Sequence, residues 1–145
     1  YAWAGDFIDA EKHFAGNGGA LAKVIGKVYW RAQSDGFPIR IGGVPSGEAK
    51  PPEVRCRGYR RIAGRPRFEY EIDGVSVAEF IEETPEGGGL RRVFEIADAP
   101  GEVAFFATSE KGGDQRVSSG RKVGSGWVVL SKEEARRFSV MVGGN

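Results

Sequence analysis

Cysteine and histidine are almost absent from this sequence, because Cys56 and His13 are the single residues of each kind among 145. One cysteine forms no internal disulfide, no paired-thiol redox centre and no Cys-x-x-Cys-His attachment site for a c-type haem. Catalysis by His13 would need a partner that the linear sequence does not identify, and no Gly-x-Ser-x-Gly nucleophile elbow is present. The sequence therefore assigns no catalytic residue, and we expect neither a cofactor nor a metal ion.

An excess of one charge is also lacking. The 21 basic and 20 acidic side chains leave a net charge of +1, which argues against nucleic acid as a partner because such binders usually carry a basic surplus. The longest apolar runs, such as residues 126–130, fall far short of the ~20 residues of a membrane helix, so no membrane span is expected. No signal-peptide pattern or initiator methionine opens the chain, and we expect it to be part of a longer polypeptide.

Glycine and proline, in contrast, are plentiful. The 23 glycines and 7 prolines predict many tight turns, which suit a chain of short strands rather than long helices. A length of 145 residues with 40% apolar and 11% aromatic side chains is typical of one globular domain. We therefore expect residues 1–145 to form a single β-rich domain.

The clearest local signal is a hairpin centred on Asp73-Gly74. Before this pair, Phe68, Tyr70 and Ile72 alternate with charged residues, and Val75-Ser76-Val77 resumes the alternation after it. An Asp-Gly pair suits a type I′ turn because both central residues need a positive φ. The predicted register pairs Ile72 with Val75, Tyr70 with Val77 and Phe68 with Glu79, which keeps most apolar side chains on one face.

About nine strands are expected, connected by hairpins rather than helical crossovers. Their number and spacing favour an all-β fold of two packed antiparallel sheets, a β-sandwich, with a five-stranded central meander over residues 54–108. Ser131-Lys132-Glu133-Glu134 has the spacing of a capping box and predicts one helical turn. The predicted strands are 2–8, 24–30, 54–62, 67–72, 75–77, 90–96, 103–108, 127–130 and 138–142.

Arginine gathers around one predicted strand, with Tyr59 among the basic residues. A basic strand with an aromatic platform is a pattern for polyanion binding. Glu69 and Glu71, however, lie on the neighbouring strand, so cross-strand ion pairs on a solvent-facing sheet explain the same pattern without a ligand. Cys56 alternates with the arginines and is predicted to be a buried strand cysteine. The arginines are Arg55, Arg57, Arg60, Arg61, Arg65 and Arg67.

Two groups of residues are candidate ligand contacts. Asp6, Asp9 and Glu11 could supply carboxylate oxygens to a hard cation, but their spacing matches no loop motif and solvated carboxylates at a strand end are the simpler interpretation. Aromatic rings can cover the apolar face of a sugar while polar neighbours bond its hydroxyls. The aromatic candidates are Trp3, Tyr29, Trp30, Tyr59 and Trp127. The residues we select as candidate ligand contacts are Trp3, Asp6, Asp9, Trp30 and Tyr59.

Two stretches carry a resemblance. One runs from residues 1–9 through Gly18-Gly19 to 26–30, and the other from 57–60 to 64–70. They resemble an uncharacterised β-rich module of large secreted or periplasmic proteins of planctomycete and verrucomicrobial type. There the module accompanies c-type cytochrome domains and propeller domains similar to quinoprotein sugar dehydrogenases. The resemblance implies an extracytoplasmic location and a neighbouring domain that handles electrons or sugars, and it transfers no catalytic residue.

Two functions follow as hypotheses. The first is a non-catalytic accessory module of a multidomain extracytoplasmic protein, which presents an aromatic surface to a glycan or to a neighbouring domain. The second is a carbohydrate-active enzyme in which Asp6, Asp9, His13 and a glutamate of the meander perform acid/base chemistry. An accessory module predicts scattered carboxylates, whereas an enzyme predicts ionisable groups that converge in one pocket with perturbed pKa values.

Overall fold

The computed structural model of the chain confirms an all-β architecture, with one short helix. It describes residues 2–4, 26–32, 36–84, 88–111, 113, 115–124 and 126–143. Among these residues, no helix has the length and apolar character to cross a membrane. The elements are β1 (Ala2–Ala4), β2 (Lys27–Ala32), β3 (Ile39–Ile41), β4 (Val54–Ile62), β5 (Arg65–Ile72), β6 (Val75–Glu83), β7 (Gly89–Glu95), β8 (Val103–Phe106), β9 (Ser109–Lys111), β10 (Arg116–Val117), β11 (Arg121–Val123), β12 (Trp127–Leu130), α2 (Lys132–Ala135) and β13 (Phe138–Gly143).

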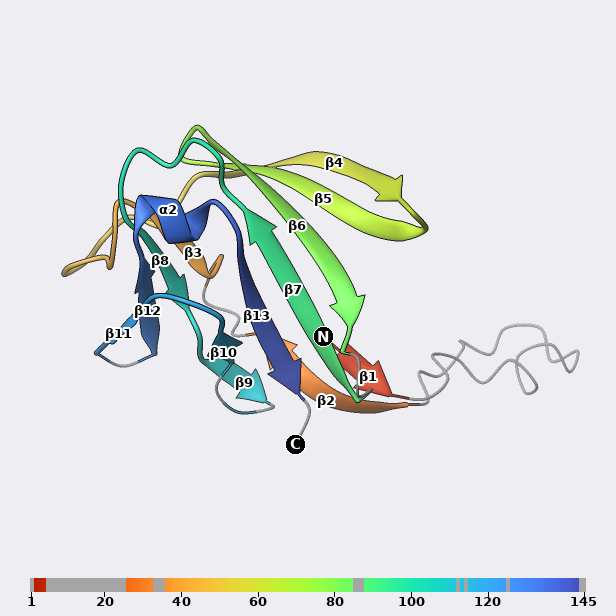
Figure 1. Cartoon of the computed structure of the whole chain (residues 1–145). Helices are drawn as coiled ribbons and strands as arrows, with labels where there is room; N and C mark the ends of the chain where they lie inside the picture. Colours follow the sequence, from red (N-terminus) through yellow and green to blue (C-terminus); the bar gives the residue numbers. More distant parts are fainter. Residues whose placement is uncertain are drawn as a thin grey trace, which may run out of the picture.

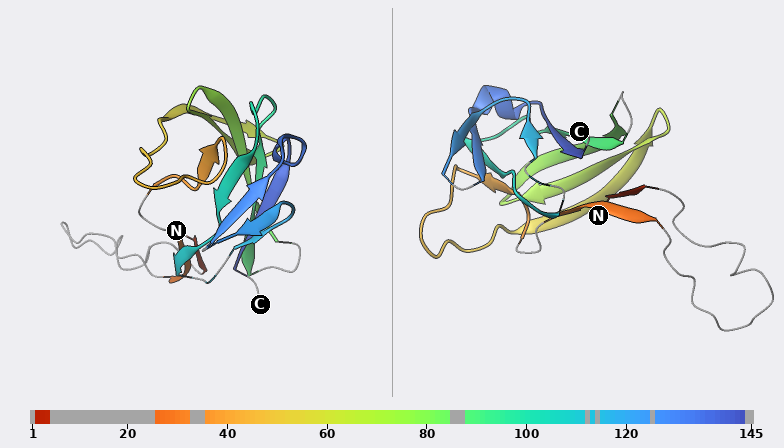
Figure 2. Two further views of the ribbon diagram at one scale, coloured as in Figure 1. Left: turned by 90° about the vertical axis from the view of Figure 1, so that its left-hand side faces the viewer. Right: turned by 90° about the horizontal axis from the view of Figure 1, so that it is seen from below.

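Two antiparallel sheets form the layers of the sandwich (Figure 1). The larger sheet has the strand order β10-β13-β7-β6-β5-β4, and the smaller has the order β11-β12-β8-β3. A third group of strands, β1-β2-β9, forms a short ribbon beside them. The views in Figure 2 show the strands curving around a shared interior, with β4 and β5 at the edge of the larger sheet.

The central meander is one strand shorter than predicted. β4, β5, β6 and β7 pair in sequence order, but β8 lies in the smaller sheet between β12 and β3. The free edge of β7 is already taken by β13, in a register that places Phe138 opposite Phe94. The chain after β7 therefore crosses to the other layer. The strands that sequence reasoning missed, β3, β9, β10 and β11, have two or three residues each, too few to display a period.

The Asp73-Gly74 hairpin has the predicted register. Ile72 pairs with Val75, Tyr70 with Val77 and Phe68 with Glu79. Asp73 and Gly74 have φ values of 48° and 80°, which are the positive angles that a type I′ turn requires. The Asp73 carboxylate also accepts a hydrogen bond from the backbone N–H of Glu53 at 2.8 Å, which ties the turn to the start of β4.

The predicted capping box forms at Ser131. The Ser131 hydroxyl accepts from the Glu134 backbone N–H at 3.2 Å, and the Glu134 carboxylate accepts from the Ser131 N–H at 2.8 Å. The same carboxylate accepts from the Gly120 N–H at 3.0 Å. These backbone donors lower the pKa of Glu134. The single turn α2, which connects β12 to β13, is therefore fixed at its N-terminus and buries Ala135.

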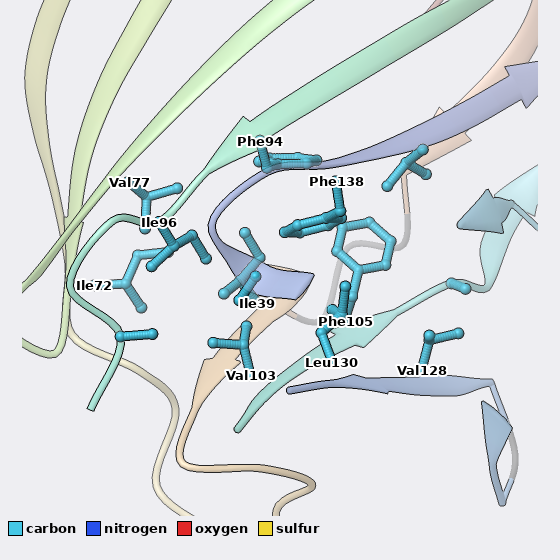
Figure 3. Close-up of a cluster of buried hydrophobic side chains, with 14 of the residues drawn as sticks. Ile39, Ile72, Val77, Phe94, Ile96, Val103, Phe105, Val128, Leu130 and Phe138 are labelled. Carbon is cyan, nitrogen blue, oxygen red and sulfur yellow. The ribbon is translucent and has the colours of Figure 1, made fainter. Parts of the chain in front are cut away.

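The core lies between the two sheets (Figure 3). Side chains of the larger sheet, such as Ile72 and Val77, meet side chains of the smaller sheet, such as Val103 and Leu130. Its centre is an aromatic cluster in which ring centroids lie 5.2 to 6.0 Å apart. The three rings are Phe94, Phe105 and Phe138. The face of the larger sheet that carries these core residues is called the inner face below, and the opposite face the outer face.

The prediction that Cys56 is buried is wrong. Cys56 is exposed, as is most of β4, because β4 is the last strand of the larger sheet and projects beyond the smaller sheet. Alternation correctly placed Cys56 on the inner face, opposite Tyr70, but the inner face is not covered there. Asp6, Asp9, Glu11 and His13, which the sequence offered as candidate cation ligands or acid/base groups, lie outside the described residues.

Candidate functional site

A cavity of about 390 Å³ opens where the ribbon meets the two sheets. This volume lies in the range of small-molecule sites, roughly 300–1,000 Å³. Five strands and the segments between them supply its walls, so the site exists only in the folded chain. The lining residues are Trp30, Ala32, Gly36, Phe37, Pro38, Arg40, Arg92, Phe106, Thr108, Gln115 and Trp127.

Aromatic side chains form the apolar part of the lining. Phe106 of β8 and Trp127 of β12 are opposite each other in the register of the smaller sheet, and their ring centroids lie 4.9 Å apart. Trp30 of β2 and Phe37, which precedes β3, complete the set. Rings of this kind offer flat apolar surface with little conformational entropy to lose on binding.

Arg92 lies in the cavity wall and is held by a buried carboxylate. Its Nε donates to Glu79 at 2.6 Å, and the Glu79 side chain is only 4% exposed. The second carboxylate oxygen of Glu79 accepts from the Tyr70 hydroxyl at 3.2 Å. Burial and the Glu79 charge raise the pKa of Tyr70, which stays a neutral donor. The Arg92 guanidinium also lies over the rings of Trp30 and Phe94, at 5.7 and 4.9 Å.

Arg40 is the second cation of the cavity, and its surroundings differ. Its Nη1 donates to the backbone carbonyls of Phe37 at 2.6 Å and Ile39 at 3.1 Å, and its guanidinium lies 6.0 Å from the Trp127 ring centroid. Burial lowers the pKa of Arg40, while the charge of Asp73 partly offsets this effect. Within the described part of the chain, no carboxylate lies within ion-pair distance of Arg40.

Two buried polar atoms of the lining have no partner among the described residues: the indole nitrogen of Trp30 and the side-chain oxygen of Gln115. Trp30 and Gln115 are 7% and 8% exposed. An indole N–H only donates and an amide oxygen only accepts, so a hydroxyl group, which does both, is the complementary partner. A buried polar atom without a partner costs about 1–3 kcal/mol, which a small shift of either side chain toward a bound hydroxyl would recover.

A row of aromatic rings connects the cavity to the free edge of the larger sheet. Phe37 contacts Tyr70, with ring centroids 5.4 Å apart. Tyr70 lies 6.4 Å from Phe68, which lies 6.2 Å from Tyr59. Tyr59 is 70% exposed and ends the row on β4. The inner face thus offers apolar ring surface from the cavity to the sheet edge.

The outer face of the same sheet is a network of ion pairs. Arg57 pairs with Glu71, and Arg60 pairs with Glu69 at 2.9 Å, as the cross-strand interpretation of the arginine-rich strand predicted. Arg91 pairs with Glu82 at 2.6 Å. A hollow of about 210 Å³ on this face includes Arg91 and Arg137, but both guanidiniums are already bound to glutamates. The outer face therefore leaves little charge for an anionic ligand.

The candidate residues selected from the sequence fall in different places. Trp30 lines the cavity and Tyr59 ends the aromatic row. Trp3 lies in β1, opposite Val28 of β2. Asp6 and Asp9 lie outside the described residues. No group of three metal-ligating side chains occurs in the described part of the chain.

Sequence reasoning missed most of the polar and aromatic lining. Phe37, Arg40, Arg92, Phe106 and Gln115 come from separate parts of the chain, and none stands in a motif. The sequence points to two of the lining residues, Trp30 and Trp127, as aromatic side chains suited to contact a sugar. No family model matches this chain, and neither a curated protein nor a solved structure does so.

Proposed function

We propose that this chain is a non-catalytic accessory module that binds a saccharide in the cavity on its inner face. The observation that carries the proposal is a cavity lined by four aromatic side chains, in which the Trp30 indole N–H is a buried donor and the Gln115 oxygen a buried acceptor, neither with a partner among the described residues. Sugars match this combination because their C–H faces pack on aromatic rings and their hydroxyls both donate and accept.

The charges of the cavity argue against the main alternative ligand of an aromatic pocket. Aromatic cages bind quaternary ammonium groups through cation–π attraction. Here Arg40 and Arg92 already contribute positive charge, and Arg92 already lies over the Trp30 ring. A second cation would be repelled, so the lining favours a neutral or anionic ligand rich in hydroxyl groups.

The aromatic row supports a chain-like ligand. A saccharide that occupies the cavity can continue over Tyr70 and Phe68 toward Tyr59 without leaving the inner face. Longer oligosaccharides should therefore bind more tightly than a single sugar. This proposal gives Tyr59, which is exposed at the edge of the sheet, a function as the outermost platform.

The alternative of a carbohydrate-active enzyme has less support. It requires Asp6, Asp9 and His13, which lie outside the described residues, together with a glutamate of the meander. The buried glutamate nearest to the cavity is Glu79, and both of its oxygens are engaged by Arg92 and Tyr70. We therefore assign the cavity to binding.

The wider setting is part of the same proposal. The resemblance implies an extracytoplasmic protein in which this module lies beside a domain that handles electrons or sugars. A saccharide-binding module would then hold a glycan near that neighbour. The sequence of the full gene product tests this setting directly, because adjoining haem or propeller domains would support it and their absence would contradict it.

The binding proposal is tested by screening the chain against a glycan array of plant and algal polysaccharides, followed by calorimetry on the hits. We expect Trp127→Ala to weaken binding at least tenfold, about 1.4 kcal/mol, because the ring forms part of the cavity wall. Ile62→Ala is the matched control, since Ile62 is 44% exposed on the outer face of β4. Silence across the array, or equal loss in both variants, would contradict the proposal.

A further inference from the structure

We propose that Arg40 makes this cavity selective for acidic saccharides, by binding the carboxylate of a uronic acid unit. The inference rests on the proposed saccharide site and specifies its ligand. It is drawn from three features of the cavity: its charge balance, the unused donors of one guanidinium, and the space beside them.

The charge balance leaves one positive charge in the cavity. Among the described residues, its lining contains two cations, Arg40 and Arg92, and no acidic side chain. Glu79 neutralises Arg92 at 2.6 Å. In the part of the chain that the structure describes, the carboxylate whose charge acts on Arg40 is that of Asp73, which forms no ion pair with Arg40 and accepts the backbone N–H of Glu53. A half-buried cation with no ion-pair partner among the described residues favours a ligand that supplies the negative charge.

The N–H groups of Arg40 fall into two sets, one bound to backbone carbonyls and one available for a carboxylate. Nη1 gives its hydrogens to the carbonyls of Phe37 and Ile39. The N–H groups on Nε and Nη2 have no partner among the described residues, and this pair forms the fork that binds the two oxygens of a carboxylate. The two bonds to backbone carbonyls and the Trp127 ring hold the guanidinium in place, so less entropy is lost when a ligand binds.

Gly36 leaves space next to this fork. A Cβ atom added at Gly36 would lie 3.6 Å from Nη2 of Arg40, and the φ of Gly36 is +124°, a conformation that other residues rarely adopt. Glycine therefore keeps one side of the guanidinium accessible. Trp127, whose ring centroid lies 6.0 Å from the Arg40 guanidinium, and Phe37 line the same cavity and supply the aromatic surface proposed for the sugar ring.

The test compares two disaccharides of equal length, one of galacturonic acid and one of galactose, by calorimetry at low and high salt. We expect the intact chain to bind the acidic disaccharide at least tenfold more tightly, with the preference reduced by salt. Arg40→Gln should remove the preference, so that the acidic and the neutral disaccharide bind with affinities within threefold of each other. Arg40→Lys should retain part of it, because lysine keeps the charge but loses the fork.

Arg136→Gln is the charge-matched control, because Arg136 is exposed at the end of α2 and does not line the cavity. It should leave both affinities unchanged. Equal binding of the two disaccharides to the intact chain, or a preference that survives in Arg40→Gln, would overturn the inference and leave the saccharide site intact. Failure of both sugars and of the glycan array would instead overturn the proposed function itself. Thermal unfolding of each variant shows whether a loss of binding reflects misfolding. If Arg40→Gln does not fold, the preference measured for Arg40→Lys tests the inference instead.

Discussion

The outer and inner faces of the larger sheet both involve arginines, but these arginines are balanced in different ways. On the outer face, Arg57, Arg60 and Arg91 each lie beside a glutamate of a neighbouring strand, in contact with solvent. On the inner face, Arg92 is held by a buried carboxylate, and the cavity in front of it contains Arg40 with no acidic partner among the described residues.

This difference in how the arginines are paired suggests different roles for the two faces of the larger sheet. Exposed ion pairs contribute about 0–1 kcal/mol each, and the pairing on the outer face leaves little free charge for a ligand. The inner face packs against the smaller sheet to form the hydrophobic core, and it also borders a cavity lined by aromatic rings, by Arg40, and by two buried polar atoms that have no partner among the described residues. The inner face therefore contributes to the core and also borders the proposed binding site.

The largest expected effect comes from the core. Phe94→Ala should lower the free energy of unfolding by about 3–5 kcal/mol, because Phe94 is fully buried between two other phenylalanines. Phe80→Ala makes the same change on the outer face, where the ring is half-buried and contacts Arg67 at 5.4 Å. Urea unfolding should show that Phe80→Ala lowers the free energy of unfolding by less than half as much as Phe94→Ala. Equal losses would show that the two faces do not differ in this way.

A second comparison removes one carboxylate from each face. Glu79→Gln should lower the free energy of unfolding by about 3 kcal/mol, because it leaves the guanidinium of Arg92 buried without its counter-charge. Glu69→Gln breaks the partly exposed contacts with Arg60 and Arg67 and should cost only about 1 kcal/mol. Chemical denaturation measures both. A Glu69 variant as unstable as the Glu79 variant would contradict the comparison.

The smallest effect concerns acid pH on the outer face. Hydrogen bonds from Arg57 and Arg91 lower the pKa values of Glu71 and Glu82. Because these folded-state values are depressed, the stability that the pairs contribute is present at neutral pH and is lost as the pH falls below about 4. Carboxyl NMR titration should show Arg57→Gln raising the pKa of Glu71 while that of Glu82 stays low. An unchanged pKa of Glu71 would show that this ion pair is not formed in solution.

Local sequence patterns predicted local structure well. The hairpin register at Asp73-Gly74 follows from turn chemistry and alternation, and the capping box at Ser131 follows from spacing. The ion pairs of Arg57 and Arg60 follow from the charges on adjacent strands. Each of these features involves residues that are close in sequence or on strands joined by a short turn.

Features that depend on long-range packing could not be predicted. β8 joins the smaller sheet because β13 occupies the edge of β7. This pairing brings together residues more than 40 positions apart in the sequence, such as Phe94 and Phe138. The exposure of Cys56 depends on how far the smaller sheet extends. The cavity combines Trp30, Arg92 and Trp127 from three distant strands, and no period or motif in the sequence connects them.

The most direct test of the inner-face cavity is an NMR titration of the chain with the galacturonic acid disaccharide, observed through the indole N–H signals of tryptophan. The chain has three tryptophans, and single substitutions assign their signals. We expect the signals of Trp30 and Trp127 to shift with saturation, while backbone amides of outer-face residues such as Glu69 and Glu71 do not move. Saturating shifts on the outer face with no change at Trp30 and Trp127 would contradict the assignment of binding to the cavity.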